Sequence, residues 1–524
     1  MIDLIFDAPA ADAGVVFDAQ TPAVPMPVIV PISDPEYEAW LSSPDAIPVT
    51  LFESDVLVDG AEVTRYTCNG SFPITGPLDS PANTFYDPIA SAGVQFTEQV
   101  SLTSAATMAV GDVEFDNGDF VRDDWYLDDI WASRGQRAYF GDARWAASNF
   151  RMILNGMASG IARKSRFLLA VKLRDQLQRL DTPISDRTFG GTSLMAGTLY
   201  PSCFGECFNI TPVYDPGTDR YYVHFGPVEW IFEVRMNGMV IDESLYTVNH
   251  AEGYFTLAVD DFGTVTCSVQ GDKFGGVYRN TVAALVRRIA TGYGKEDGRY
   301  IDADLDLANL DAFEASHPQK AGIYITDNTT VKNAIDQLAS SLGAQAIPSR
   351  LGKLRLIQIG IAGASTFDIR VHHMKNGTLE PVTSIPPVAA ASIGYDRNWT
   401  KQDNLVTAIS DANKQLFVDD YLYATTTNDD VADDYKMSTA VTAKPTLLKI
   451  KAEAQAEADR LVDLGAVPRS IYKFTGTPEM LQIVLGQQVT IYHHENSMAA
   501  GVRAQVIMLA PEWKQGSCDV GVLV

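Results

Sequence analysis

The chain has 524 residues, of which 46% are hydrophobic and 20% are charged, and its formal net charge at pH 7 is −26. Domains usually hold about 100–200 residues, so this length predicts several domains, and the hydrophobic fraction excludes an intrinsically disordered chain. No apolar run reaches the ~18 residues that a membrane-spanning helix needs, and the acidic excess argues against nucleic-acid or anionic-lipid binding as the main role. We expect a large, soluble, acidic protein.

Residues 1–48 are predicted to form an extended N-terminal arm. The stretch 22–31 contains four prolines and cannot be helical, because proline lacks an amide donor and restricts the residue before it. A short echo, Ile5-Phe6-Asp7-Ala8 and Val16-Phe17-Asp18-Ala19, predicts one or two short strands rather than a repeat array. The first residues lack the basic region of a signal peptide.

Residues 49–165 are rich in β-branched residues and turns. Short strands are predicted at 49–53, 56–58 and 61–66, with a Val-Asp-Gly turn before the third. Residues 94–102 alternate between apolar and polar positions, as a half-buried strand does, and the strand that begins at Val113 runs into an Asn-Gly turn.

Residues 166–280 continue the pattern of short strands. A strand is predicted at 167–173, a loop rich in Gly and Ser at 190–205, and turns at 215–217 and 237–238. These features predict a second β domain.

Helices are predicted from residue 281 onward, at 282–292, at 330–342 and at 445–464. The second has an apolar face, Asp327 or Thr329 as its N-cap and Gly343 at its end, and Gly465 ends the third. Strands of a closing sheet follow at 480–492, 502–509 and 519–524. The predicted fold class is therefore β-dominated α+β, with several domains and a few short helices.

Eight carboxylates are concentrated in the segment 112–129, where only Arg122 offsets them. Such a cluster could bind Ca²⁺, which takes several oxygen ligands. The EF-hand pattern fails because position 117, which should be glycine, is asparagine. We favour a solvated acidic loop, and interpret the acidic residues at 419–420 and 429–434 in the same way. The eight carboxylates are Asp112, Glu114, Asp116, Asp119, Asp123, Asp124, Asp128 and Asp129.

The sequence contains no serine-hydrolase, zinc-protease, phosphate-loop or dinucleotide-binding motif. A carboxylate pair could serve a glycosidase, but among 66 acidic residues a suitable pair is certain by chance. We therefore predict a protein that is not an enzyme, with no catalytic, cofactor-binding or metal-binding residues and no cofactor.

Histidine and cysteine patterns favour no metal centre. The pairs His372-His373 and His493-His494 could not chelate one ion from a strand, because strand neighbours point to opposite faces. Cys203 and Cys207 form a CxxxC pattern, but zinc or iron–sulfur binding requires further cysteines. Cys68, Cys267 and Cys518 are scattered, so we interpret all five as buried free thiols, leaving open that the fold brings some together.

One stretch of the chain is basic, at 163–179. It could bind nucleic acid, but in so acidic a chain we favour contact with an acidic patch on another copy or subunit. Its cations are Arg163, Lys164, Arg166, Lys172, Arg174 and Arg179.

Four pieces of sequence resemble the central hub proteins of phage tails. The most specific is the stretch at 200–212, which is similar to the family's recurring run of proline, aromatic residue and glycine followed by Phe-Asn-x-x-Pro. The four pieces are Tyr66–Phe72 with Gly76–Asp87, Val110–Asp119 with Arg134–Gly141, Leu173–Leu177 and Thr182-Pro183 with Tyr200–Pro212, and the helix at 445–465 with Leu485–Ile491 and Gly501.

This resemblance implies a structural protein at the distal end of the tail of a virion, made in the host cytoplasm. Such hubs form homotrimers, in which each chain contributes two tube-like β-barrels, and the ring caps the tail tube and lets DNA pass during ejection. The implied partners are the tail tube, distal tail proteins, tip fibres or spikes, and the tape-measure protein, without sequence-specific nucleic-acid binding. A net negative charge fits a channel that DNA crosses without sticking.

The resemblance also suggests a division of the chain. The expected domains are an arm (1–48), a first tube-like β-barrel (49–165), a second β domain that completes the hub (166–280), an α+β domain (281–400), and a C-terminal helix with a tube-like β domain (401–524). The chain departs from many hubs because no lytic or carbohydrate-binding module is recognisable, and only Cys518 lies near the end. Two alternatives are a receptor-binding tail adhesin and a virion-associated cell-wall or polysaccharide hydrolase.

Overall fold

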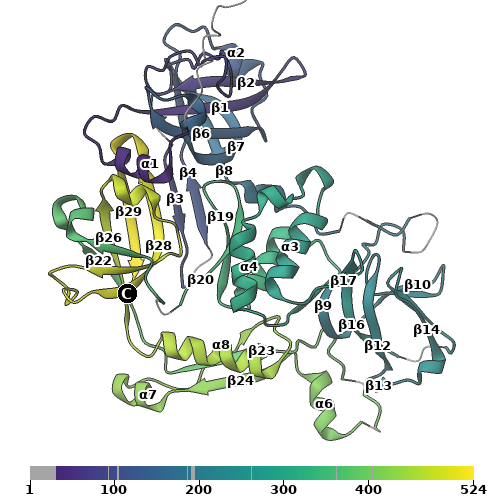
Figure 1. The fold of residues 1–524 in the computed structure, drawn as a ribbon. Helices are drawn as coiled ribbons and strands as arrows, with labels where there is room; N and C mark the ends of the chain where they lie inside the picture. Colours follow the sequence, from purple (N-terminus) through teal and green to yellow (C-terminus); the bar gives the residue numbers. More distant parts are fainter. Residues whose placement is uncertain are drawn as a thin grey trace, which may run out of the picture.

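The computed structural model describes residues 31–524 except 92–93, 103–105, 186, 191–194, 261–262, 361–362, 404 and 408. The strands predicted within residues 1–30 lie outside this part. The predicted fold class is confirmed, since several separate sheets dominate and short helices gather in the middle of the chain. Figure 1 shows the first barrel at the top, the C-terminal sheet at the left and the second β domain at the right.

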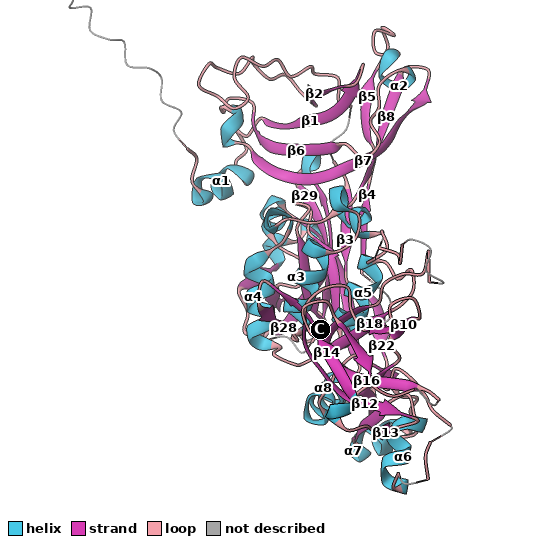
Figure 2. Cartoon of the chain, turned by 90° about the vertical axis from the view of Figure 1, so that its right-hand side faces the viewer, coloured by secondary structure: helices cyan, strands magenta, loops and turns pink. Residues whose placement is uncertain are grey.

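The first barrel is a curved antiparallel sheet with the strand order β2-β1-β6-β7-β8-β5. The runs predicted at 49–53 and 56–58 belong to one strand, β1, and Asp59 and Gly60 both have positive φ, as a two-residue type I′ turn requires. Figure 2 shows how strongly these strands bend. The strands are β1 (Pro48–Val58), β2 (Ala61–Cys68), β5 (Val113–Asp116), β6 (Gly135–Asp142), β7 (Arg151–Ser165) and β8 (Leu168–Arg174).

The segment 87–91 bridges the two edges of this sheet. On one side the Cys68 amide donates to the Asp87 carbonyl at 2.8 Å, and on the other the Asp116 amide donates to the Ile89 carbonyl at 2.8 Å. The edge strands β2 and β5 thus share a partner, which closes the barrel over part of its length and leaves less exposed edge.

The arm contains a helix, α1 (Asp34–Leu41), so it is not extended throughout. The Ser33 amide and hydroxyl both donate to the Glu36 carboxylate at 2.8 Å, which forms a capping box. Trp40 of this helix packs against Phe140 of the barrel, so local capping and tertiary packing together fold the end of the arm.

The second β domain holds two sheets around one core that includes Val234 and Phe255. The larger has the order β13-β12-β16-β9-β18, with β17 beside β16, and the smaller has the order β10-β11-β15-β14. The first set is β9 (Ser202–Ile210), β12 (Val228–Met236), β13 (Met239–Val240), β16 (Val265–Phe274), β17 (Val277–Tyr278) and β18 (Gly322–Ile325). The second set is β10 (Val213–Asp215), β11 (Arg220–Tyr222), β14 (Tyr246–Asn249) and β15 (Tyr254–Leu257).

The predicted helix at 282–292 is α3 (Val282–Gly292), and the next is α5 (Val331–Ser340). The N-cap of α5 is Thr330, whose hydroxyl accepts from the Asn333 amide at 3.2 Å, rather than Asp327 or Thr329. Gly343 follows with φ +61°, as predicted for the helix end. Around them lie α4 (Leu307–Ser316), β19 (Ala344–Pro348) and β20 (Leu354–Gln358).

The longest helix is α8 (Lys451–Leu464), with Gly465 at its C-cap as predicted. It begins later than residue 445 because residues 444–445 form β25 (Lys444–Pro445), which pairs with β23. The helix packs on the sheet β24-β23-β25. The neighbouring elements are β23 (Ala390–Tyr395), α6 (Asp411–Val418), β24 (Leu422–Thr427) and α7 (Asp429–Tyr435). In the described part of the chain, no helix is both long enough and apolar enough to span a membrane.

The C-terminal sheet collects strands from distant parts of the chain. Its order is β21-β27-β28-β29-β26-β22, and the hairpin of β3 and β4 joins it through β28. The sheets therefore cross the expected domain boundaries, and one hydrophobic core runs through both the first barrel and the C-terminal sheet. The strands are β3 (Phe96–Gln99), β4 (Thr107–Val110), β21 (Phe367–Arg370), β22 (Glu380–Ile385), β26 (Arg469–Gly476), β27 (Gln488–Tyr492), β28 (Val502–Glu512) and β29 (Ser517–Leu523).

Candidate functional sites

The acidic segment 112–129 is spread over β5, a turn and the short helix α2 (Asp124–Leu127). Three of its carboxylates form ion pairs, in which Glu114 meets Lys164, Asp119 meets Arg122, and Asp129 meets Arg65. Within the described residues, no three carboxylates of this segment bring their oxygens together as cation ligands would. Five of the eight carboxylates are exposed, as expected for a solvated loop, namely Asp112, Asp116, Asp119, Asp124 and Asp128.

The histidine pair at 372–373 is not in a strand, so the argument from opposite strand faces does not apply to it. The residues lie in a 3₁₀ turn after β21, with ring centroids 4.0 Å apart, and Glu479 joins them. Their potential ligand atoms lie within 4.8 Å of one another, as in a candidate metal centre.

The hydrogen bonds of His373 count against metal binding. Its Nδ1 accepts from the Arg370 amide at 3.1 Å, which places the proton of the neutral ring on Nε2, and Nε2 faces a Glu479 oxygen at 3.1 Å. A metal at Nε2 would require the opposite tautomer, with a proton on Nδ1 pointing at the amide hydrogen. Burial, assisted by His372, lowers the pKa of His373, so the group is a neutral histidine that donates to a carboxylate.

The two rings of the other histidine pair lie in different surroundings. The His493 side chain is buried and its Nε2 lies 3.0 Å from the Gly377 carbonyl, whereas His494 is exposed beside Glu495. Each ring is thus occupied by a local contact.

All five cysteines are buried and free. Cys203 and Cys207 lie on β9, and Cys267 lies on the adjacent β16. Burial raises the pKa of the Cys203 and Cys267 thiols, so both stay protonated and unreactive at neutral pH.

The basic stretch forms the turn between β7 and β8 and continues along β8. Arg163, Lys164 and Arg166 are exposed at the turn, where Lys164 pairs with Glu114. Arg179 lies farther on, with its guanidinium over the Tyr300 ring and 3.2 Å from Asp304. Its contact with another subunit stays a prediction.

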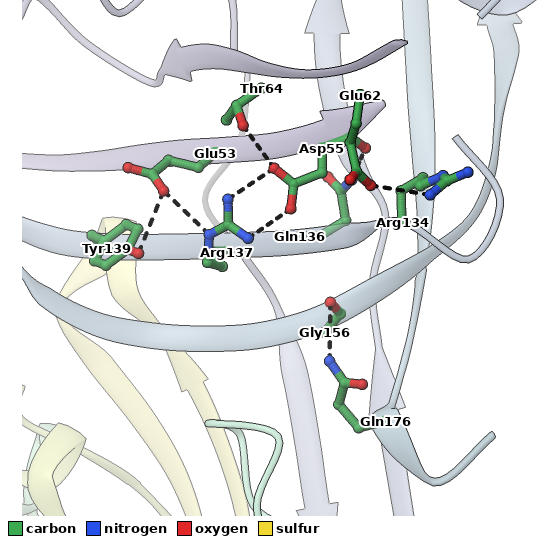
Figure 3. Close-up of polar contacts among 10 residues, drawn as sticks. All are labelled: Glu53, Asp55, Glu62, Thr64, Arg134, Gln136, Arg137, Tyr139, Gly156 and Gln176. Atoms are coloured by element: carbon green, nitrogen blue, oxygen red, sulfur yellow. Dashed lines mark hydrogen bonds and ion pairs between the residues drawn. The ribbon is translucent and has the colours of Figure 1, made fainter. Parts of the chain in front are cut away.

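An ion network covers the face of the first barrel across β2, β1 and β6 (Figure 3). Arg137 donates to Asp55 at 2.7 and 2.9 Å and to Glu53 at 3.2 Å, and Thr64 donates to Asp55 at 2.8 Å. Burial alone would raise the pKa of Asp55, but these hydrogen bonds outweigh it and hold the pKa below its usual value. The network fixes the register of three strands.

A second polar cluster is buried between the second β domain and α3. Asp272 on β16 accepts two hydrogen bonds from Arg288, at 2.7 and 3.0 Å, and one from the Tyr293 hydroxyl at 2.7 Å. Burial alone would raise the pKa of Asp272, but His224 and Arg288 lower it well below its usual range. Sequence reasoning missed this cluster because its members lie far apart along the chain.

A cavity of about 500 Å³ lies where the β3–β4 hairpin approaches α5, β19 and α8. Asp175, Asp336 and Lys332 line it, and burial raises the pKa of both carboxyls against the opposing charge of the lysine. Carboxyls with raised pKa in a cavity are one ingredient of acid–base chemistry. No motif in the sequence marks these residues.

No protein-family model and no curated protein matches the chain. The solved structures that align with it include phage tail proteins and a chain of a native gene transfer agent virion. The virion chain is 13% identical and aligns over 66% of this chain and 91% of its own, with a TM-score of 0.41.

Two further alignments cover nearly the whole chain. The 43 kDa tail protein of prophage MuSo2 from Shewanella oneidensis is 8% identical over 91% of this chain and 98% of its own, with a TM-score of 0.38. The prophage tail protein gp18 from Listeria monocytogenes EGD-e is 10% identical over 91% and 94%, with a TM-score of 0.33. Scores below 0.5 do not define a common fold, so no function is transferred from these alignments.

Proposed function

We propose that this chain is a structural hub at the distal end of a phage tail. Three copies would form a ring that caps the tail tube, joins it to tip or fibre proteins, and lets DNA pass. The observation that carries the proposal is the place of the hub-like sequence pieces in the fold. They fall on β2 and the loop after it, on β5 and β6, on β8 and β9, and on α8 with β27.

The construction of the fold supports a mechanical role. The first barrel and the C-terminal sheet share one hydrophobic core, and the β3–β4 hairpin passes from one to the other. A body joined in this way transmits force without a hinge between its halves, because close-packed interiors resist deformation.

The copy number tests the proposal directly. A structure of the tail end, or the mass of the ring after dissociation from the tail, should give three copies. One, two or six copies per tail end would contradict it. The purified ring should also bind DNA weakly, and tight binding that salt abolishes would show a basic channel instead.

A cell-wall or polysaccharide hydrolase is the second candidate, which the cavity lined by Asp175 and Asp336 favours. If it is right, the purified chain releases sugars or peptides from peptidoglycan, and Asp175→Asn and Asp336→Asn each abolish the release. Absence of turnover by the native chain, measured beside a lysozyme control, would remove this candidate.

A further inference from the structure

We propose that a groove along the edge of β18 binds the N-terminal segment of the same chain, residues 1–22. The groove has a volume of about 610 Å³, which suits a short peptide. Its walls come from β18 and the residues after it, from residues 211–213, which follow β9, from Gln337 of α5, and from residues 397–400. This docking would hold whether or not the chain belongs to a tail.

The first support is an arginine that lacks a carboxylate partner. The Arg397 guanidinium lies 3.9 Å from the centre of the Trp399 ring, and within the described part of the chain it forms neither an ion pair nor a hydrogen bond. It is the only cation among the described residues that line the groove. Stacking fixes the planar group in place, so little entropy is lost when an anion binds.

The loop that carries Arg397 is held firmly. The Asn398 amide group donates to the Phe417 carbonyl at 2.9 Å and its oxygen accepts from Asn209 at 2.8 Å. The Trp399 amide donates to the Phe208 carbonyl at 3.3 Å. The arginine is therefore presented on a rigid support, as a binding site requires.

The second support is an open strand edge. β18 is the last strand of its sheet, and residues 323–327 line the groove in succession. The Gly322 amide points away from β9, to the Leu447 carbonyl at 3.1 Å, so by alternation the backbone groups of Tyr324 also face the open side. An extended peptide could add there as a further strand.

The third support is the chemistry of the segment itself. Residues 1–30 contain four aspartates and no lysine, arginine or histidine. Twice an apolar pair precedes aspartate and alanine, in Ile5-Phe6-Asp7-Ala8 and Val16-Phe17-Asp18-Ala19. In a strand, Phe and Asp point to opposite faces, so the aspartate can meet Arg397 while the phenylalanine packs on an apolar wall.

Asp327 is the one carboxylate among the described residues that line the groove, and the hydrogen bonds that it accepts weaken its repulsion of the aspartates in the segment. The Asp327 Oδ1 accepts from the Thr329 amide at 3.0 Å and from its hydroxyl at 2.5 Å. Extended, the 22 residues of the segment span up to roughly 70 Å, and residues 23–30 connect them to residue 31.

Photo-crosslinking in the full chain tests the docking. Phe6 or Phe17 is replaced by p-benzoylphenylalanine, and the products are mapped by mass spectrometry after irradiation. We expect cross-links to peptides containing 322–327 or 397–400 in a product with the mass of one chain, and a product with the mass of two chains would overturn the proposal. The yield should fall about tenfold in Arg397→Gln and in the double variant Asp7→Asn with Asp18→Asn, as loss of a charge-assisted hydrogen bond predicts.

The matched control is Arg187→Gln. Arg187 likewise stacks on an aromatic ring, Phe225 at 4.2 Å, but does not line the groove, so its replacement should leave the yield unchanged. Cross-links to the exposed apolar residues at 120–127, or none at the groove in protein with native circular dichroism, would overturn the proposal. An unchanged yield in folded Arg397→Gln would overturn it as well.

Discussion

Replacement of Asp142 by asparagine should loosen the helix α1 from the first barrel. Asp142 at the end of β6 is fully buried and joins three parts of the chain. Its Oδ2 accepts from the Trp40 indole at 2.8 Å and from the Ile47 amide at 2.9 Å, while Oδ1 accepts from the Arg144 amide at 3.0 Å. The Arg144 guanidinium donates to both oxygens, from Nε to Oδ1 at 2.6 Å and from Nη2 to Oδ2 at 2.7 Å.

An asparagine cannot satisfy these donors. Its amide group carries hydrogens where one carboxylate oxygen accepted two or more bonds, so at least one buried N–H loses its acceptor. A buried donor left without a partner costs about 1–3 kcal/mol, and the remaining bonds lose the strength that the negative charge gave them. We expect a local loss of about 2–4 kcal/mol, which raises the opening equilibrium of α1 by roughly thirty- to several-hundredfold.

The effect should depend on pH in a defined direction. Burial alone would raise the pKa of Asp142, but the hydrogen bonds from Arg144 and from the Ile47 amide outweigh it and hold the pKa well below its usual value. A carboxyl with a depressed folded pKa stabilises above its unfolded pKa, about 3.9, and loses this contribution as the pH falls further. The difference between native chain and variant should therefore be full at pH 7 and shrink below about pH 4.

Hydrogen exchange of residues 34–47, followed by mass spectrometry, measures this local opening. The control is Asp34→Asn, because Asp34 pairs with Arg151 at 2.7 Å but is 81% exposed and should contribute less than about 0.5 kcal/mol. Exchange in Asp142→Asn that equals the native rate at pH 7 would refute the reasoning, as would a difference that grows on acidification.

Three further predictions concern a buried ion pair, the cysteines and bound cations. Asp272→Asn should destabilise the junction of α3 with the second β domain by about 3–5 kcal/mol, because it leaves Arg288 buried without a counter-charge, and urea unfolding beside the exposed-pair control Asp302→Asn measures this. In the native chain a thiol reagent should label none of the five cysteines, and all five after unfolding; rapid labelling of native protein would contradict their burial. EDTA should lower the melting temperature little, and a drop of about 10 °C or more would reveal a bound cation, since ligands that bind the folded state stabilise it.

Local sequence signals predicted local structure well. The helix at 282–292 has its apolar residues on one face, and its bounds agree with those of α3. The Asp-Gly turn at 59–60 and the glycine ends of α5 and α8 are also as predicted. Each of these depends on interactions within a few residues, which a short window of sequence contains.

Competition between local signals explains several differences. The predicted start at residue 445 was too early, because Pro445 belongs to β25, which pairs with β23, and the Thr446 amide donates to the Gly394 carbonyl of β23. For α5, Asp327 and Thr329 bond to each other, which leaves Thr330 to cap the helix. The argument from opposite strand faces fails for the pair at 372–373, because the strand ends at Arg370 and a turn brings both rings together.

Long-range pairing could not be predicted, but one residue marks where it occurs. In the alternating run at 94–102, Glu98 falls on the same face as Phe96 and Val100, a face that a solvated strand would keep apolar. The structure buries Glu98, and the Arg350 amide donates to it at 2.5 Å while the Arg355 guanidinium lies at 3.8 Å. A buried carboxylate needs a donor or a cation, so Glu98 could only be accommodated by a distant segment. Those partners lie on β20 and on the turn before it, while β3 itself pairs with β28 of the C-terminal sheet. The hairpin therefore joins segments from distant parts of the chain, and the sheets do not follow contiguous stretches of sequence.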